Sequence, residues 1–187
     1  MKTAALIKAC ALAAAFVAGI VAIEGVLAQE LFANPRAIVD FQRAADDYAF
    51  LHRQVERRIG MAHRRSGDPA DTIGARELAA GIMAERPRPV VLFTPAVVAV
   101  FRDAAARELR AGCDAGELRS GVWELTHEPY APATGARAVS PCMVSALPGL
   151  PDELEYRSAG TVLLLVDPHA NLVVDVLPAL LAGSDIR

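Results

Sequence analysis

The residues best suited to chemistry lie in and beside one short segment near the end of the chain. Asp167 and His169 belong to Asp167-Pro168-His169-Ala170-Asn171, and Asp175 follows soon after. A turn between two strands can bring two carboxylates and an imidazole to one end of a sheet, and metal binding or acid–base chemistry needs such groups. Asn171 can add an oxygen ligand. One hypothesis is therefore a metal or acid–base site formed by Asp167, His169 and Asp175.

The same residues also have a purely structural interpretation. Asp-Pro and Asn are common turn formers, and His169 is then an exposed turn residue. Asp175 can cap a backbone group or pair with an arginine such as Arg157. The alternation of Glu155 and Arg157 is typical of the solvent-facing side of a half-exposed strand. The sequence assigns no catalytic residue, no cofactor and no reaction, so both interpretations stay open.

The remaining histidines form no recognisable metal motif. His52, His63 and His127 are scattered, without the spacing of a zinc-binding pair. The stretch Glu124–His127 has the spacing of half a helical di-iron site, which requires a second copy and further carboxylates. His52 falls within an apolar helical stripe. It is predicted to be a packed core histidine with a satisfied partner, the alternative being a ligand that faces another helix.

The N-terminal residues have the pattern of an export signal. Lys2 and Lys8 precede the apolar run Ala9–Ile23, and Val26-Leu27-Ala28 offers small residues before Gln29. The uncharged run is shorter than the roughly 20 residues that cross a bilayer core. We therefore expect residues 1–28 to be a signal peptide cleaved between Ala28 and Gln29, leaving a periplasmic or secreted protein. The alternative is an uncleaved leader that anchors the chain in the inner membrane, facing outward.

Cys113 and Cys142 are the two cysteines left after removal of this leader. In an oxidising compartment a lone pair of thiols tends to join, so we predict a Cys113–Cys142 disulfide. The alternative is a nucleophilic cysteine with a base such as His127, although neither cysteine lies in a recognisable nucleophile motif.

Charge and composition exclude few partners. The formal net charge is −3 at pH 7, and loss of the leader makes it slightly more negative, which argues against nucleic-acid binding. Membrane association is expected only through an uncleaved leader.

Three helices are predicted in the first part of the exported chain. Asn34-Pro35 opens the first, which ends near Gly60 and has an apolar stripe that includes Tyr48 and His52. Ala70–Glu85 is the second, and its apolar positions are Ile73, Leu78 and Ile82. Thr94-Pro95 opens a third, through about Arg110.

Strands are predicted in the last part. Leu154–Ser158, Thr161–Val166 and Leu172–Leu177 are rich in β-branched and apolar residues and are separated by turn formers. The middle strand is apolar on both faces, so it should be central and covered by the first and third helices. Two alternatives remain: a helix over Leu172–Leu181, and an extra strand at Val90–Phe93. The predicted fold is α+β, one domain over 29–187, with a helical part (34–110), an irregular disulfide-closed loop (111–151) and a β-meander (152–178).

Several segments resemble a group of secreted bacterial proteins that has no assigned activity. They are Phe93-Thr94-Pro95 with Phe101-Arg102, then Leu150–Arg157, then Asp167 with Ala170–Asp175. The resemblance covers most of the exported chain and implies a shared fold and export, with no implied chemistry. Ser158-Ala159-Gly160-Thr161 departs from the group's pattern of a bulky residue and a charged turn, which implies a different hairpin turn here.

Two functions follow from these observations. The first is a non-catalytic envelope or periplasmic module that binds a protein or envelope component through the long helix or a sheet edge. The second is a small envelope hydrolase or metal-binding protein that uses the Asp167, His169 and Asp175 region. The second requires those side chains to converge on one point.

Overall fold

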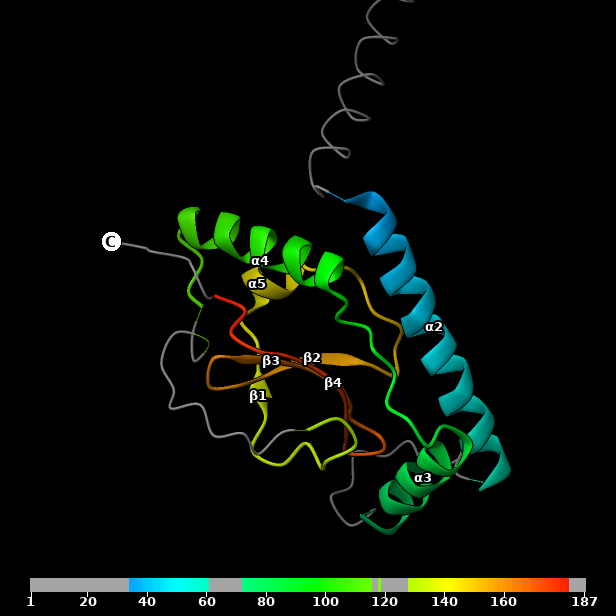
Figure 1. Ribbon diagram of the computed structural model, residues 1–187. Coiled ribbons are helices and arrows are strands. Elements are labelled where there is room, and N and C mark those ends of the chain that lie inside the picture. The colour runs from blue at the N-terminus through cyan, green and yellow to red at the C-terminus, as the bar shows by residue number, and fades with distance from the viewer. Residues whose placement is uncertain (1–33, 61–71, 116–117, 119–127, 182–187) are drawn as a thin grey trace, which may run out of the picture. The chain divides into compact units, whose positions relative to one another are not determined.

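The computed structural model describes residues 34–60, 72–115, 118 and 128–181, and the statements below concern those residues. The predicted signal peptide and its cleavage site lie outside them, as do His63 and His127. Within the described residues, no helix is long and apolar enough to cross a membrane. The fold is α+β, as predicted, with helices and one four-stranded antiparallel sheet in the order β1-β2-β3-β4 (Figure 1).

The first described helix, α2, spans Pro35–Arg58 and confirms the prediction from the apolar stripe. The stripe is buried, with Phe41, Tyr48 and His52 among its members. Arg57 and Arg58 lie in the last turn, where positive charge offsets the negative end of the helix dipole.

Two further helices agree with the sequence in part. Helix α3 spans Thr72–Glu85, and α4 spans Pro95–Arg110 with Thr94 as its N-cap. Of the apolar positions of α3, Leu78 and Ile82 are buried, whereas Ile73 is 67% exposed. Helix α3 packs closely on α2 at Gly81, where any side chain would overlap Val55.

The three predicted strands are β2 (Glu155–Ala159), β3 (Val162–Asp167) and β4 (Leu172–Leu177). Strand β3 is central and fully buried, as expected. The alternative of a helix over Leu172–Leu181 was wrong, because Leu172–Leu177 forms strand β4. The alternative of an extra strand at Val90–Phe93 was also wrong, because that segment does not join the sheet.

The described part of the segment 111–151 contains more regular secondary structure than the irregular loop that was predicted. It contains β1 (Arg137–Ala138), which pairs with β2, and a short helix, α5 (Pro141–Ser145). Both elements are too short to show a hydrophobic period in the sequence.

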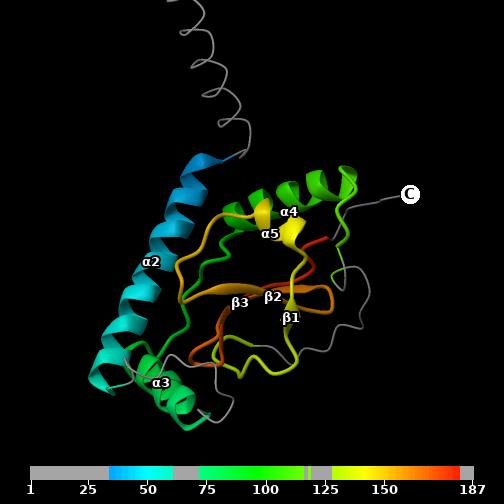
Figure 2. The ribbon, with the colours of Figure 1, turned by 180° about the vertical axis from the view of Figure 1, so that it is seen from behind.

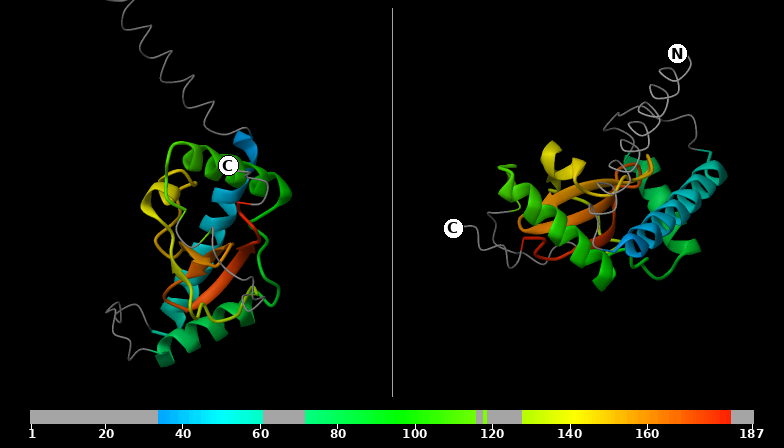
Figure 3. Two further views of the ribbon diagram at one scale, coloured as in Figure 1. Left: turned by 90° about the vertical axis from the view of Figure 1, so that its left-hand side faces the viewer. Right: turned by 90° about the horizontal axis from the view of Figure 1, so that it is seen from above.

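Helices α2 and α4 cover one face of the sheet. Tyr156 of β2 contacts Phe101 of α4, and Phe101 in turn contacts Phe41 of α2, so the two helices and the sheet share one aromatic core. Helix α4 lies near the start of α2 and α3 near its end (Figures 1 and 2). Views from the side and from above show α2 and α4 beside the sheet (Figure 3). This packing confirms the predicted cover of the central strand.

The opposite face of the sheet has its own small core. Val162, Leu164 and Val166 of β3 pack there with Val173 of β4, and Ala133 and Ala136 lie against them. Because successive side chains of a strand alternate between faces, Leu163, Leu165 and Asp167 point to the other side, toward the helices. The pleat of β3 therefore directs an aspartate into the layer between sheet and helices.

A disulfide joins Cys113, just after α4, to Cys142 in α5, with an S–S distance of 1.97 Å and 29 residues of separation. The structure thus pairs the two cysteines as predicted. The bond ties the end of α4 to the start of α5.

Removal of this cross-link is expected to destabilise the protein. A loop of this length restricts the unfolded chain by about 3–4 kcal/mol in the chain-entropy model. The double variant Cys113→Ser/Cys142→Ser should lose about that much unfolding free energy in urea titrations. Wild-type protein in reductant should match it, and equal stability of oxidised and reduced protein would contradict the expectation.

Candidate functional site

The site centres on Asp167, the last residue of β3, whose side chain is fully buried. Its Oδ1 accepts a hydrogen bond from the backbone N–H of Ala170 at 2.9 Å, which closes the turn between β3 and β4. The turn was predicted from Asp-Pro and Asn, and Asn171 has the positive φ of 47° that such residues tolerate. One carboxylate oxygen thus holds the turn, and the other faces α2.

Helix α2 supplies two side chains to the second oxygen. The Tyr48 hydroxyl donates to Asp167 Oδ2 at 2.9 Å, and His52 Nδ1 lies 2.6 Å from the same oxygen. Residues four apart share one face of a helix, so the stripe that buries the apolar side chains also presents Tyr48 and His52 to the end of β3. A carboxylate only accepts, so His52 Nδ1 carries the proton in this pair.

His169 completes a three-residue cluster from the solvent side. Its ring centroid lies 5.5 Å from that of His52, and it is exposed, whereas His52 and Asp167 are buried. One ligand atom from each of His52, Asp167 and His169 lies within 4.8 Å of the others. Among the described residues this is the one cluster with the donors and spacing for a metal ion.

The charges around the cluster fix its protonation. Burial, then the charge and hydrogen bond of Asp167, raise the pKa of Tyr48, so its hydroxyl stays a donor. Burial lowers the pKa of His52, but the hydrogen bond to Asp167 and the negative charges of Asp167, Glu56 and Glu153 outweigh it, and the net pKa is raised above 6.5. The centre therefore favours positive charge.

Glu153 adds an unusual feature beside the cluster. Its side chain is only 8% exposed, and its Oε1 accepts from Arg53 at 2.8 Å. Its Oε2 is buried and has no hydrogen-bond partner within the described part of the chain. Buried polar atoms are nearly always paired, so this oxygen is an acceptor still able to take a donor.

Asp175 does not join the cluster. It lies opposite Leu165 in the ladder, and its Oδ2 accepts from the backbone N–H groups of Leu92 and Phe93 at 2.6 and 2.7 Å. Burial raises the pKa of Asp175 although these N–H donors oppose the rise. Its role is therefore structural, and the prediction that it caps backbone groups is confirmed. The alternative of a pair with Arg157 was wrong, because Arg157 pairs with Glu155.

The sequence thus identified part of the centre. Asp167 and His169 come together as the site hypothesis required, and the inclusion of Asp175 was wrong. His52 is a buried core histidine with a partner, as predicted, but that partner was not identified. Tyr48 was missed as a polar contributor; its signal was a hydroxyl inside an apolar stripe, since a buried hydroxyl needs a partner.

The metal-free protein should lose stability as the pH rises past neutrality. The folded-state pKa of His52 lies above its unfolded value of 6.5, so its stabilisation is full below pH 6.5 and is lost as pH rises through the folded pKa. Each unit of difference is worth about 1.4 kcal/mol. In urea titrations, the gap in unfolding free energy between wild type and His52→Gln should narrow with rising pH. A constant gap from acidic to alkaline buffer would contradict this.

Comparisons of this chain with protein-family models, curated proteins and solved structures found no match. The resemblance to secreted bacterial proteins therefore stays a prediction. What the centre can do rests on its own geometry.

Proposed function

We propose that this is an exported protein that binds one divalent transition-metal ion through His52, Asp167 and His169. The observation that supports the proposal is the approach of two imidazoles and one carboxylate to within 4.8 Å of one another. This nitrogen-rich set suits zinc, cobalt, nickel or copper better than calcium or magnesium, which prefer oxygen ligands.

The surroundings of Asp167 suit a ligand role. Tyr48 and the Ala170 N–H hold the carboxylate by hydrogen bonds, as outer groups commonly hold metal-binding carboxylates. The proton on His52 Nδ1 is donated to Asp167 Oδ2, 2.6 Å away, and a cation that displaces this proton gains both groups as ligands. His169 then binds from the exposed side. With three protein ligands, a position stays open for water or for a group of a partner.

The disulfide and the leader pattern support a role outside the cytoplasm. The paired cysteines fit an oxidising compartment, and the leader pattern predicts transport there. Export itself is part of the proposal. An intact mass of protein recovered from a bacterial periplasm tests export. The expected mass is that of a chain that begins at Gln29. A full-length mass in the membrane fraction would establish the anchored alternative.

The decisive variant for metal binding is His169→Ala. His169 is exposed and contacts the buried His52 only through its ring, so its loss should leave the unfolding free energy within about 0.5 kcal/mol of wild type. Zinc affinity, measured by calorimetric titration of chelator-treated protein, should fall by about a hundredfold or more, because one of three ligands is lost. His63→Ala is the matched control for nonspecific histidine binding and should keep wild-type affinity.

Two results would contradict the proposal. One is the absence of saturable zinc binding by wild-type protein, and the other is unchanged affinity in His169→Ala. In either case the buried Tyr48–His52–Asp167 contacts would be a purely structural link between α2 and β3. The prediction of a non-catalytic module that binds a protein or envelope component would then be the leading account.

A further inference from the structure

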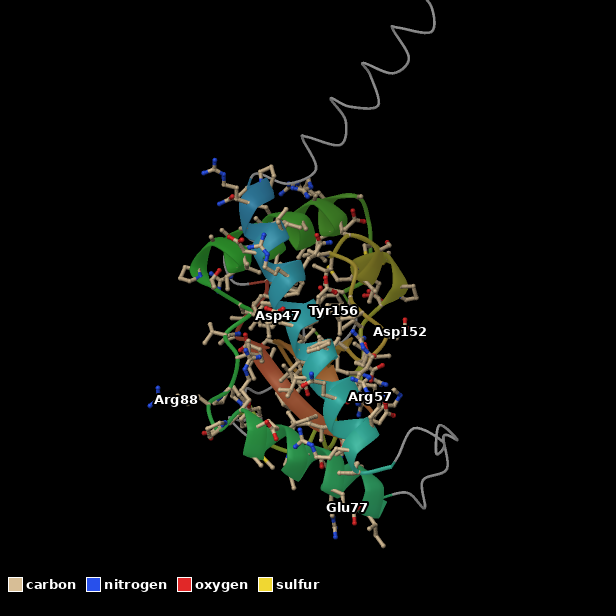
Figure 4. All side chains as sticks on the ribbon, turned by 90° about the vertical axis from the view of Figure 1, so that its right-hand side faces the viewer. Asp47, Arg57, Glu77, Arg88, Asp152 and Tyr156 are labelled. Atoms are coloured by element: carbon tan, nitrogen blue, oxygen red, sulfur yellow. A yellow bond between two sulfur atoms is a disulfide. The ribbon has the colours of Figure 1, made fainter. Side chains whose placement is uncertain are left out.

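A groove of about 450 Å³ lies along the seam between α2 and the segment that precedes β2. Gln42 and Asp46 of α2 form one wall, and Gly149, Leu150 and Pro151 form the other. Its volume falls in the range of sites that bind small ligands or short peptide segments. Figure 4 shows α2 crossing in front of the sheet, and the residues that line the groove do not include the metal-binding residues.

The helix face beside the groove carries exposed apolar side chains. Val39 and Phe50 are 51% and 56% exposed. At helical spacing they fall within one stripe together with Gln42 and Asp46, near the outer rim of the groove. Leu150 and Pro151 supply apolar surface from the facing wall. An extended segment laid in the seam can therefore bury apolar side chains against both walls.

The charges along the seam select a positive partner. Asp46 lines the groove, and the exposed Asp152 follows directly after its facing wall. Farther along, Arg53 of α2 closes the same seam by pairing with Glu153, whose second carboxylate oxygen is buried without a partner in the described structure. The exposed acceptors beside the groove, Asp46 and Asp152, are both carboxylates. An acidic peptide would meet repulsion here, whereas a lysine or arginine side chain would find an acceptor.

From these features we propose that the groove is a docking site for an extended peptide segment in which a lysine or arginine neighbours an apolar residue. The basic side chain pairs with Asp46, and the apolar residue packs on Leu150 and Pro151. The metal-binding residues take no part in this contact. The proposal of a docking site is therefore independent of the proposal of metal binding. It identifies a surface through which the predicted interaction module could bind a partner.

Gly149 allows the groove to be filled without disturbing the fold. A Cβ built at Gly149 meets no atom within 4 Å, and the residue does not have the positive φ that restricts substitution. Gly149→Trp should therefore occupy the groove and leave the unfolding free energy near that of wild type. Asp46→Lys reverses the charge of the wall, and Asp47→Lys is its matched control, because Asp47 is also exposed but points about 100° away around the helix.

The test is selection from a random-peptide phage library on immobilised wild-type protein, followed by affinity measurement on synthetic copies of the enriched peptides. We expect enrichment of peptides with lysine or arginine beside an apolar residue. Their affinity should fall by roughly tenfold or more for Gly149→Trp and for Asp46→Lys, and stay unchanged for Asp47→Lys.

Three outcomes would overturn the proposal. They are the absence of any enriched sequence, enrichment of acidic peptides, and equal binding of the enriched peptides to wild type and Gly149→Trp. Sedimentation of the wild-type protein tests whether a second copy of this chain occupies the groove. A concentration-dependent dimer that Gly149→Trp abolishes would assign the groove to that second copy and also overturn the peptide proposal. Zinc affinity measured on the same variants should not change, which keeps this test distinct from that of the metal centre.

Discussion

Replacement of Asp167 by asparagine is expected to lower the unfolding free energy by about 3–5 kcal/mol. The carboxylate accepts from the Tyr48 hydroxyl, His52 Nδ1 and the Ala170 N–H, all in a buried position. An amide cannot accept on its nitrogen, so either the Ala170 N–H or both the Tyr48 hydroxyl and His52 Nδ1 lose their acceptor, and removal of one member of a buried charged pair carries a cost of this size. Urea denaturation of the metal-free variant measures the loss.

The matched control for this substitution is Asp152→Asn. Asp152 is an exposed aspartate in the segment before β2, so its change should stay within about 0.5 kcal/mol of wild type. Equal stability of wild type and Asp167→Asn would show that the buried network does not link α2 to the sheet. The account of how Asp167 is positioned would then be wrong.

Replacement of Asp175 by alanine is the second large effect, with an expected loss of about 2–4 kcal/mol. Asp175 Oδ2 accepts from the buried N–H groups of Leu92 and Phe93, which directly precede the N-cap of α4. Two buried donors without acceptors each cost about 1–3 kcal/mol. Phe93 also belongs to the aromatic core with Phe41 and Phe101, so a shift of its backbone disturbs that packing.

Thermal and urea unfolding of Asp175→Ala measure this loss. Zinc titration of the same variant distinguishes the structural role of Asp175 from the proposed ligand role of Asp167. Asp175 lies outside the metal cluster, so its variant should bind zinc as wild type does while it remains folded. Glu155→Gln is the surface control, because the ion pair of Glu155 and Arg157 is partly open to solvent and contributes little. A wild-type stability for Asp175→Ala would refute its anchoring role.

The sequence was sufficient for those elements whose side chains repeat with a clear period. The stripe from Phe41 through Tyr48 to His52 indicated α2, and the doubly apolar β3 indicated a central strand. Strand β1 was missed because it is two residues long and exposed, which leaves no alternation to detect. The apolar positions of α3 did not show which of them is buried: Ile73 is exposed, and α3 contacts α2 through Gly81.

The candidate site was harder to predict because its partners are far apart in the chain. His52 and Asp167 are separated by 115 residues, and each separately shows only a polar group in an apolar setting. The ladder between β3 and β4 also shifts register between Leu165 and Val166. Asp175 lies opposite Leu165, whereas Asp167 pairs with Leu172, and no local pattern of the sequence marks the bulge between these two pairs.

The most direct test of the metal centre is anomalous diffraction at the zinc absorption edge from crystals of the chelator-treated protein soaked in zinc. The account predicts one strong peak within bonding distance of His52, Asp167 and His169, and its loss in His169→Ala crystals. A peak elsewhere on the protein, or none at a saturating zinc concentration, would contradict metal binding at this centre.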